Sequence, residues 1–276
     1  MHRNPAARAT VHAALVLYTL LAVSPIVLVL INSFKSRNAI FGSPLSLPGP
    51  KTFSLIGYTS VLGKADFPLY FVNSLVVTGG SLALVLFFGA MAAWALTEYR
   101  FRGNTPVALY MAIGIMVPIR LGTVAILKLI VAMHLANTLT ALILVYTAMG
   151  LPLAIFILSE FIQQIPRELR DAARIDGASE YRVFWSVILP LIRPAVATVA
   201  VFTMVPIWND LWFPLILAPG QSTQTVTLGV QQFIGQYVTD WNAVISALSL
   251  ALAPILVLYI VFSRSLVRGI TAGAVK

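Results

Sequence analysis

The sequence predicts an all-helical membrane protein that crosses the bilayer six times, and three observations lead to this fold class. The 276 residues are 59% hydrophobic and only 10% charged, whereas a soluble domain carries about 25% charged residues. Long uncharged runs recur along the chain, and no run alternates polar and apolar residues as the strands of a membrane barrel do. Helices are therefore the expected spans, because they satisfy their own backbone hydrogen bonds in lipid.

Six segments have the length and apolar character of membrane helices, which need about 20 residues each. They lie near residues 13–31, 74–97, 105–119, 137–159, 194–218 and 243–263. The third segment is short, and Asn209 and Asp210 interrupt the fifth. The apolar segment 122–136 contains Lys128, and we interpret it as a helix at the outer surface. We expect residues 1–276 to form a single transmembrane domain in contact with membrane lipid.

The basic residues predict the orientation of these spans. With six spans both termini lie on the same side, which then carries twelve of the 18 Lys and Arg residues: Arg3, Arg8, Arg100, Arg102, Arg167, Arg170, Arg174, Arg182, Arg193, Arg264, Arg268 and Lys276. Because the richer side is normally the cytoplasm, we expect both termini there. The net charge of +9 is spread over short loops and tails, so we expect no nucleic-acid partner.

The segment from residue 160 to 190 is predicted to lie in the cytoplasm, and it holds most of the acidic residues. Pro166 can begin a helix, since its missing N–H needs no partner there. Gly177 suits a left-handed cap at the helix end. Ser179 can cap a second helix that ends near Pro190. The sequence therefore predicts a short charged helix, a tight turn and a second helix that leads into the fifth span.

Two interpretations of the first short helix remain open from its residues alone. Ala172 and Ala173 are small, so the helix could press closely into the groove of a partner protein while the flanking charged residues make polar contacts. The segment could equally be a solvated helix that only joins two spans.

The spacing in this segment resembles a known motif. Asp171-Ala172-Ala173-x-x-x-Gly177, nine residues, then Val187-x-Leu189-Pro190 is similar to the coupling motif of ATP-binding-cassette importer permeases, with Asp in place of Glu and Val in place of Ile. In that family the helix docks into a cleft of the ATPase subunit. The resemblance implies that the ATPase-coupling residues are Glu168, Asp171, Ala172, Ala173, Arg174, Asp176, Gly177, Leu189 and Pro190.

Shorter matches extend the resemblance to the maltose-type carbohydrate permeases. They are Asn32-Ser33-Phe34-Lys35, Phe71-Val72-Asn73-Ser74-Leu75, Met116-Val117-Pro118, Trp208-Asn209-Asp210 and the tail 269–276. The resemblance implies the type I importer fold in a bacterial cytoplasmic membrane. It also implies three kinds of partner: a homologous second permease, two ATP-binding-cassette ATPase subunits and an extracytoplasmic sugar-binding protein.

The chain carries no sign of a catalytic or metal site. It has no cysteine and no Gly-x-x-x-x-Gly-Lys-Ser/Thr loop to hold nucleotide phosphates. Its histidines, His2, His12 and His134, lack helix-spaced partners for a metal. We therefore expect a non-catalytic subunit without a cofactor of its own, with ATP and Mg bound by the partner ATPase.

Polar residues inside apolar spans are functional candidates. Trp208, Asn209, Asp210 and Trp212 combine aromatic faces with hydrogen-bonding groups, which suits sugars, so we expect them along the translocation path; Asn73 is a weaker candidate. Two structural readings compete: the tryptophans could form an interfacial belt, and Asn73 could bond between helices.

Other functions stay open at this stage. A permease of the same class could carry a non-sugar solute such as a glycerol-phosphate-type compound. An ion-coupled secondary transporter would need an intramembrane carboxylate, for which Asp210 is the candidate. An intramembrane enzyme would need catalytic pairs, and the histidines lack partners for them.

Overall fold

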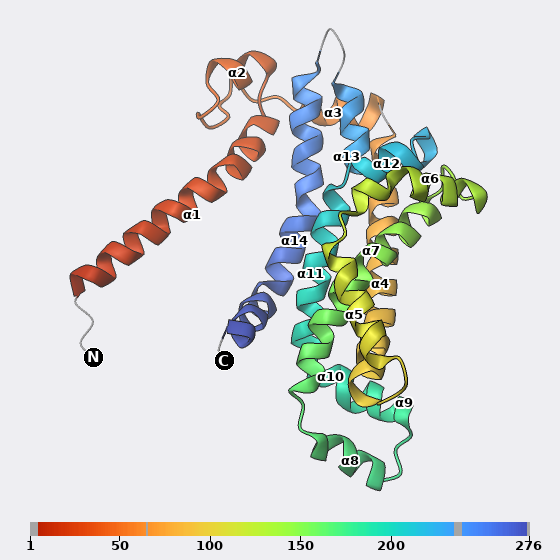
Figure 1. The fold of residues 1–276 in the computed structure, drawn as a ribbon. Coiled ribbons are helices and arrows are strands. Elements are labelled where there is room, and N and C mark those ends of the chain that lie inside the picture. The colour runs from red at the N-terminus through yellow and green to blue at the C-terminus, as the bar shows by residue number, and fades with distance from the viewer. Residues whose placement is uncertain (1–4, 65, 235–238, 275–276) are drawn as a thin grey trace. The chain divides into compact units, whose positions relative to one another are not determined.

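The computed structural model describes residues 5–64, 66–234 and 239–274, and these residues form helices joined by short connections (Figure 1). The chain separates into two compact units, Met1–Pro68 with Gly229–Ala253, and Leu69–Leu228 with Pro254–Lys276. We describe each unit by itself. Arg3, Val275 and Lys276, used above for the charge count and the tail, lie outside the described residues.

The first unit is built around the end of α1 (Pro5–Ser33), the short helices α2 (Arg37–Gly42) and α3 (Ile56–Lys64), and the first turns of α14 (Trp241–Ala274). The turn η4 (Gln231–Phe233) also belongs to it. Lys35 is fully buried here, and its ammonium donates to Asn32 Oδ1 at 3.2 Å and to the carbonyl oxygens of Ser43 at 2.9 Å and Pro44 at 3.2 Å. Asn242 in turn donates to the Lys35 carbonyl at 2.7 Å. The loop after the first predicted span is therefore an ordered structure.

The long helices of the second unit are α4 (Phe67–Glu98), α7 (Leu139–Gln163) and α11 (Arg193–Asn209). Packed against them are α5 (Asn104–Met116), η1 (Ile119–Gly122), α6 (Thr123–Ala132) and α12 (Trp212–Leu217), followed by η3 (Gln221–Thr223) and α13 (Val226–Val230). At one end lie α8 (Arg167–Ile175), α9 (Glu180–Val183), the π-helical turn η2 (Phe184–Ile188) and α10 (Leu189–Leu191), whereas α6 and α12 lie at the other (Figure 1).

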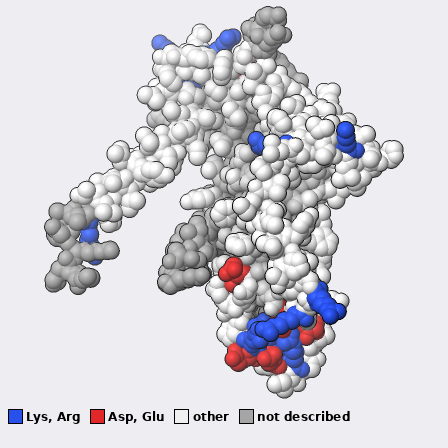
Figure 2. Space-filling model, in the orientation of Figure 1, with Lys and Arg blue, Asp and Glu red and all other residues white. Residues whose placement is uncertain are grey.

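Charge is distributed in the same polarised way. On the face that Figure 2 shows, Lys, Arg, Asp and Glu gather over the end formed by α8 and α9, while the helices beside it are almost free of charge. Helices with apolar side chains and one charged end are expected when the helices face lipid and that end faces water.

Small residues set the spacing of α4 and α7. A Cβ atom added to Gly89 would lie 2.9 Å from the Cβ of Ala154, and one added to Gly150 would lie 2.7 Å from Val85 Cγ2. Both distances are shorter than real contacts allow. Gly89 and Gly150 thus allow the close helix packing that membrane helices use in place of a hydrophobic driving force.

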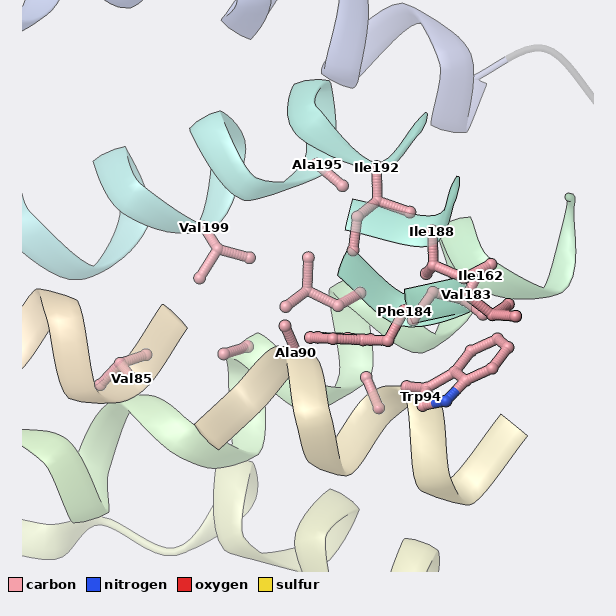
Figure 3. Packing of buried hydrophobic residues seen from close by; sticks show 13 residues of the cluster. Val85, Ala90, Trp94, Ile162, Val183, Phe184, Ile188, Ile192, Ala195 and Val199 are labelled. Carbon is pink, nitrogen blue, oxygen red and sulfur yellow. The ribbon is translucent and has the colours of Figure 1, made fainter. Parts of the chain in front are cut away.

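A buried core joins the charged end to the long helices (Figure 3). Trp94 and Ala90 of α4 and Ile162 of α7 meet Phe184 of η2 and Val199 of α11, together with other apolar side chains. Phe184 is 6% exposed and Ile162 is fully buried. This core fixes η2 and the start of α11 against α4 and α7.

Helix lengths agree with part of the predicted spans. Three described helices, α1, α4 and α7, are long and apolar enough to cross a membrane without a break. The third predicted span is only 13 residues in α5, about 20 Å, after which the chain bends by 90° into η1 and α6. The fifth stops at Asn209, as its polar interruption suggested. The structure thus confirms several apolar spans, and the count of six stays a prediction.

Candidate functional site

The helix of the coupling motif, α8, ends in a backbone structure that its glycine makes possible. Gly177 has φ of +79°, a left-handed conformation that glycine adopts without steric cost. Its N–H donates to the Arg174 carbonyl at 3.0 Å, and the Ala178 N–H donates to the Ala173 carbonyl at 3.0 Å. These two bonds form a Schellman motif. The predicted left-handed cap is confirmed, and the hydroxyl of Ser179 caps α9 by accepting the Arg182 N–H.

Two arginines on the inner side of α8 attach it to the end of α4. Arg170 and Arg174 each donate to a different oxygen of Glu98, and the guanidinium of Arg170 also lies 5.9 Å from the centre of the Trp94 ring. Arg170 is only 5% exposed. Because a buried charge is costly unless it is paired, Glu98 is the residue that permits Arg170 to face the core. Arg174, expected at the ATPase surface, is bound within this network.

The network continues to α9 through Glu180. Arg174 Nε donates to Glu180 at 2.8 Å, and the Tyr99 hydroxyl donates to the same carboxylate at 2.7 Å. The hydrogen bond from Arg174 holds the pKa of Glu180 below its ordinary value. Desolvation, together with the bond to Glu180, raises the pKa of Tyr99. The two short helices and the end of α4 are therefore joined by charge-assisted hydrogen bonds.

The outer face of α8 is open. Glu168, Ala172 and Ile175 share this face by their i, i+4, i+7 spacing and are exposed, and so are Leu169, Asp171 and Asp176. Ile175 is an apolar residue between two charged ones, and it is 86% exposed. Ala173 instead packs inward against the buried core. The two alanines of the motif thus have different surroundings: Ala172 lies on the open face, and Ala173 does not.

The second half of the motif forms the connection to α11. Leu189 packs against the buried core, and Pro190 lies in α10, which continues by one residue past the predicted end. The segment 180–191 then bends by 74° into α11. Both the π-helical turn and the prolines interrupt the regular i→i−4 bonding, which is a recognised cause of sharp helix bends.

The polar interruption at the far end of α11 is centred on Asp210. Its carboxylate accepts the N–H groups of Trp212 at 3.3 Å and Phe213 at 3.1 Å, the first two N–H groups of α12, which have no partner within the helix. The hydroxyl of Tyr146 on α7 donates to Asp210 at 2.8 Å. Arg120 of η1 forms a long ion pair with it at 3.5 Å. The Asp210 side chain is 9% exposed, whereas that of Arg120 is 68% exposed.

A cavity of about 250 Å³ opens beside this cluster. Its polar lining residues are Arg120, Tyr146, Thr203 and Asp210, and Phe202 and Pro206 belong to its largely apolar wall. All of these residues belong to the second unit. The arrangement combines one carboxylate, hydroxyl groups and an aromatic ring, so it can bind a ligand that is apolar on one side and hydroxylated on another.

The other residues expected along the path have different surroundings. Trp208 is 2% exposed and packs edge-to-face on Phe71 at 5.6 Å. Asn73 is 4% exposed and donates to the carbonyl oxygens of Ser222 and Gln224, both at 2.9 Å. Neither lines the cavity. Their buried contacts hold the chain near Asp210 in place.

Asn209 and Trp212 are exposed at the helix break. Asn209 donates to the Val205 carbonyl at 2.8 Å, within its own helix. The indole N–H of Trp212 donates to Thr123 Oγ1 of α6 at 2.9 Å. The structure therefore brings Asp210 and Trp212 together with η1 and α6, a neighbourhood that the sequence did not indicate.

Three residues of these clusters were missed by sequence reasoning: Glu98, Arg120 and Tyr146. Glu98 and Arg120 were visible only as a single acid at the end of a span and a single base after the third span. Their partners lie 72 and 90 residues away in the sequence. A search for opposite charges at the same ends of different spans could have found both pairs, since such charges usually pair.

Comparison with known proteins agrees with this arrangement. Residues 85–272 match the family described as the binding-protein-dependent transport system inner membrane component. The chain is 33% identical over 267 residues to the diacetylchitobiose uptake system permease protein of Streptomyces coelicolor, covering 96% of this chain and 88% of that protein. It is 32% identical over 229 residues to the melibiose/raffinose/stachyose import permease protein of Bacillus subtilis, covering 82% and 83%.

A solved structure supports the fold. A bacterial ABC transporter involved in the import of the acidic polysaccharide alginate contains a chain with a TM-score of 0.81 and 19% identity, covering 96% of this chain and 99% of that one. The family match includes α7, α8 and α11 and therefore both the coupling motif and the Asp210 cluster. This chain belongs to the family of inner membrane components of binding-protein-dependent transport systems.

Proposed function

We propose that this chain is the permease subunit of an ATP-driven, binding-protein-dependent importer of oligosaccharides. The open face of α8, which carries the coupling motif and the exposed Ile175, is the observation that carries the proposal, together with the family match and the sugar-uptake relatives. The partners are a homologous permease, two ATP-binding-cassette ATPases that bind ATP and Mg, and an extracytoplasmic sugar-binding protein.

The coupling mechanism follows from how α8 is attached. The ATPase contacts the outer face of α8, whose inner face is bound to the end of α4 through Glu98 and whose chain continues through the core into α11. A displacement of α8 is then passed to α4 and α11 as packed bodies. Such packed elements favour two discrete arrangements, so ATP binding and release can select inward- and outward-facing states.

The far end of α11 places the Asp210 cluster where this movement would change it. We infer that Asp210, Asn209 and Trp212 belong to the translocation path, with Trp208 and Asn73 as its buried support. The carboxylate of Asp210 favours a neutral sugar over a phosphate ester, because like charges repel in a partly buried site. This argues against the glycerol-phosphate-type alternative.

The test is reconstitution. The chain is co-expressed with a homologous permease, an ATP-binding-cassette ATPase and a binding protein, purified, and placed in liposomes. ATP-dependent uptake is measured for diacetylchitobiose, raffinose, arabinotriose and maltotriose. We expect ATPase to copurify and at least one sugar to accumulate. Failure of the ATPase to copurify would contradict the coupling role, and accumulation of none of these sugars would contradict the substrate class.

A matched pair of variants tests the docking face. Ile175→Glu places a charge at the centre of the proposed contact, and we expect the ATPase to be lost from the purified complex. Leu45→Glu is the control, because Leu45 is similarly exposed at 78% but lies in the loop after α2. Equal retention of ATPase by both variants would exclude Ile175 from the contact.

A further inference from the structure

The cavity beside Asp210 contains a hydroxyl group that has no partner. Thr203 of α11 is 6% exposed, lines this cavity, and its Oγ1 makes no hydrogen bond. A buried hydroxyl without a hydrogen-bond partner is destabilising. A helical threonine normally avoids this cost by bonding to the carbonyl of the preceding turn, as Thr198 of the same helix does with Pro194 at 3.0 Å. A ligand in the cavity that Thr203 lines could supply the missing partner once the buried Oγ1 turns toward it.

The neighbouring polar groups restrict what that ligand can be. Asp210 Oδ1 accepts only two long contacts, 3.3 Å from the Trp212 N–H and 3.5 Å from Arg120, so it can accept a shorter bond from a ligand hydroxyl. The Tyr146 hydroxyl donates its hydrogen bond to Asp210, and its oxygen can still accept a hydrogen bond from a ligand. A lipid chain would leave the Thr203 hydroxyl without a partner. A metal ion would find only one carboxylate.

The remaining wall restricts the shape of the ligand. Phe202, Met149 and Pro206 present apolar surface to the same cavity. A volume of about 250 Å³ lies below the roughly 300–1,000 Å³ of complete small-molecule sites. The cavity therefore fits one ring of a longer ligand, with an apolar ring face on one wall and hydroxyl groups toward the other.

We propose that the cavity between α7, α11 and η1 is a subsite for one neutral sugar ring, in which Thr203, Tyr146 and Asp210 bind ring hydroxyls and Phe202 packs against the ring face. The subsite rests on the proposed function and assigns part of the sugar recognition to this chain itself. Arg120 also lines the cavity, and its side chain is 68% exposed. Its contact with Asp210 is long, at 3.5 Å, so Arg120 can leave Asp210 when a sugar enters.

Two threonine variants test the subsite, with uptake per assembled complex as the first measurement. Thr203→Val removes the unpaired hydroxyl and keeps the shape. We expect uptake of the sugar that the complex imports to fall about 2- to 10-fold, the range of one hydrogen bond. The apparent melting temperature should stay equal or rise, since no native bond is lost. Thr198→Val, at 7% exposure on the same helix, should leave uptake unchanged. Equal effects of the two variants, or a loss of uptake that only follows loss of stability, would overturn the proposal.

The absence of cysteine from the chain permits a second, direct test. Thr203→Cys is reacted in membranes with a small methanethiosulfonate reagent, with and without the imported sugar at saturating concentration. We expect the sugar to slow labelling at least several-fold, while Thr198→Cys is unaffected by it. Labelling of Cys at position 203 that is independent of the sugar would mean a cavity filled by water, lipid or a side chain of the second permease. If the complex imports none of the four sugars, the proposed function itself fails.

Discussion

Arg170 illustrates how a single residue couples a surface helix to the membrane bundle. It belongs to a helix whose outer face is exposed, yet its own side chain is 6% exposed and is paired with Glu98. In the proposed mechanism, the bonds between Glu98 and two arginines of α8 would carry a movement of α8 into α4. The pair is also a point of weakness, since removing one partner leaves a buried charge uncompensated.

The first prediction concerns this pair. Glu98→Gln should destabilise the chain by roughly 3–5 kcal/mol, the usual effect of breaking a buried ion pair, because Arg170 keeps its charge and loses its partner. Glu168→Gln removes an equal charge from the exposed face of α8 and should change the free energy of unfolding by less than about 0.5 kcal/mol. Chemical denaturation of the purified chain in detergent compares the two. Equal midpoints would mean that Glu98 does not hold α8.

Residues with local roles were accessible to sequence reasoning, whereas those with distant partners were not. Gly177 and Ser179 act on their own turns, so spacing alone predicted both roles. Glu98 and Arg120 act through residues of other helices, and their pairing depends on how the bundle packs. Trp208 was expected along the path because of its neighbours; the structure buries it against Phe71, and its role in the path stays a prediction.

At the scale of elements, hydrophobic runs predicted where the long helices lie but not where they bend. The predicted segment 74–97 is part of α4, and 137–159 largely coincides with α7. The bend after α5 and the π-helical turn before α10 depend on packing against other helices as well as on Pro118 and Pro190. The sequence shows the prolines, but it does not show which contacts make up for the lost backbone bonds.

The second prediction tests the turn that ends α8. No atom lies within 4 Å of a Cβ built on Gly177, so backbone conformation rather than space decides what can replace it. Asparagine tolerates φ of +79° and should retain most uptake. Alanine should lose about 1 kcal/mol of local stability, and proline, whose φ is fixed near −65°, should abolish coupled uptake. Uptake and membrane insertion of all three variants are compared. Full uptake by Gly177→Pro would refute the coupling role of this turn.

The third prediction uses two glycines of the same helix, α4. Gly89→Ala forces a Cβ to 2.9 Å from Ala154, whereas nothing lies within 4 Å of a Cβ on Gly79. We expect Gly89→Ala to destabilise the chain by about 1–3 kcal/mol, as overpacking usually does. Gly79→Ala should be neutral or stabilising by up to about 1 kcal/mol through helix propensity. Denaturation midpoints in detergent decide between them. A midpoint for Gly89→Ala that matches the wild type would show that α4 and α7 adjust freely.

At the largest scale, the helices of the second unit have two chemically different ends. Charged residues gather at the end with α8 and α9 (Figure 2), and α6 and α12 lie at the other end (Figure 1). The Asp210 cluster lies beside η1, α6 and α12. The helix α11 begins in the core at the first end and stops at Asp210 at the other. In the proposed importer, the ATPase contact and the outward opening lie on opposite faces of the membrane, and α11 (Arg193–Asn209) would connect the two.

The fourth prediction is the orientation of these ends. Single cysteines introduced into the cysteine-free chain are labelled in intact cells with an impermeant thiol reagent. Thr59 in α3 and Gln221 in η3 are exposed residues of predicted outer segments, and Gln164 and Tyr181 are exposed beside α8. Because the richer basic side should face the cytoplasm, Cys at positions 59 and 221 should react at once, and Cys at 164 and 181 only after the cells are opened. The reverse pattern would place α8 outside, away from any ATPase. Labelling of 59 and 221 from opposite sides would instead disprove the six-span count, since an even number of spans must separate these two positions.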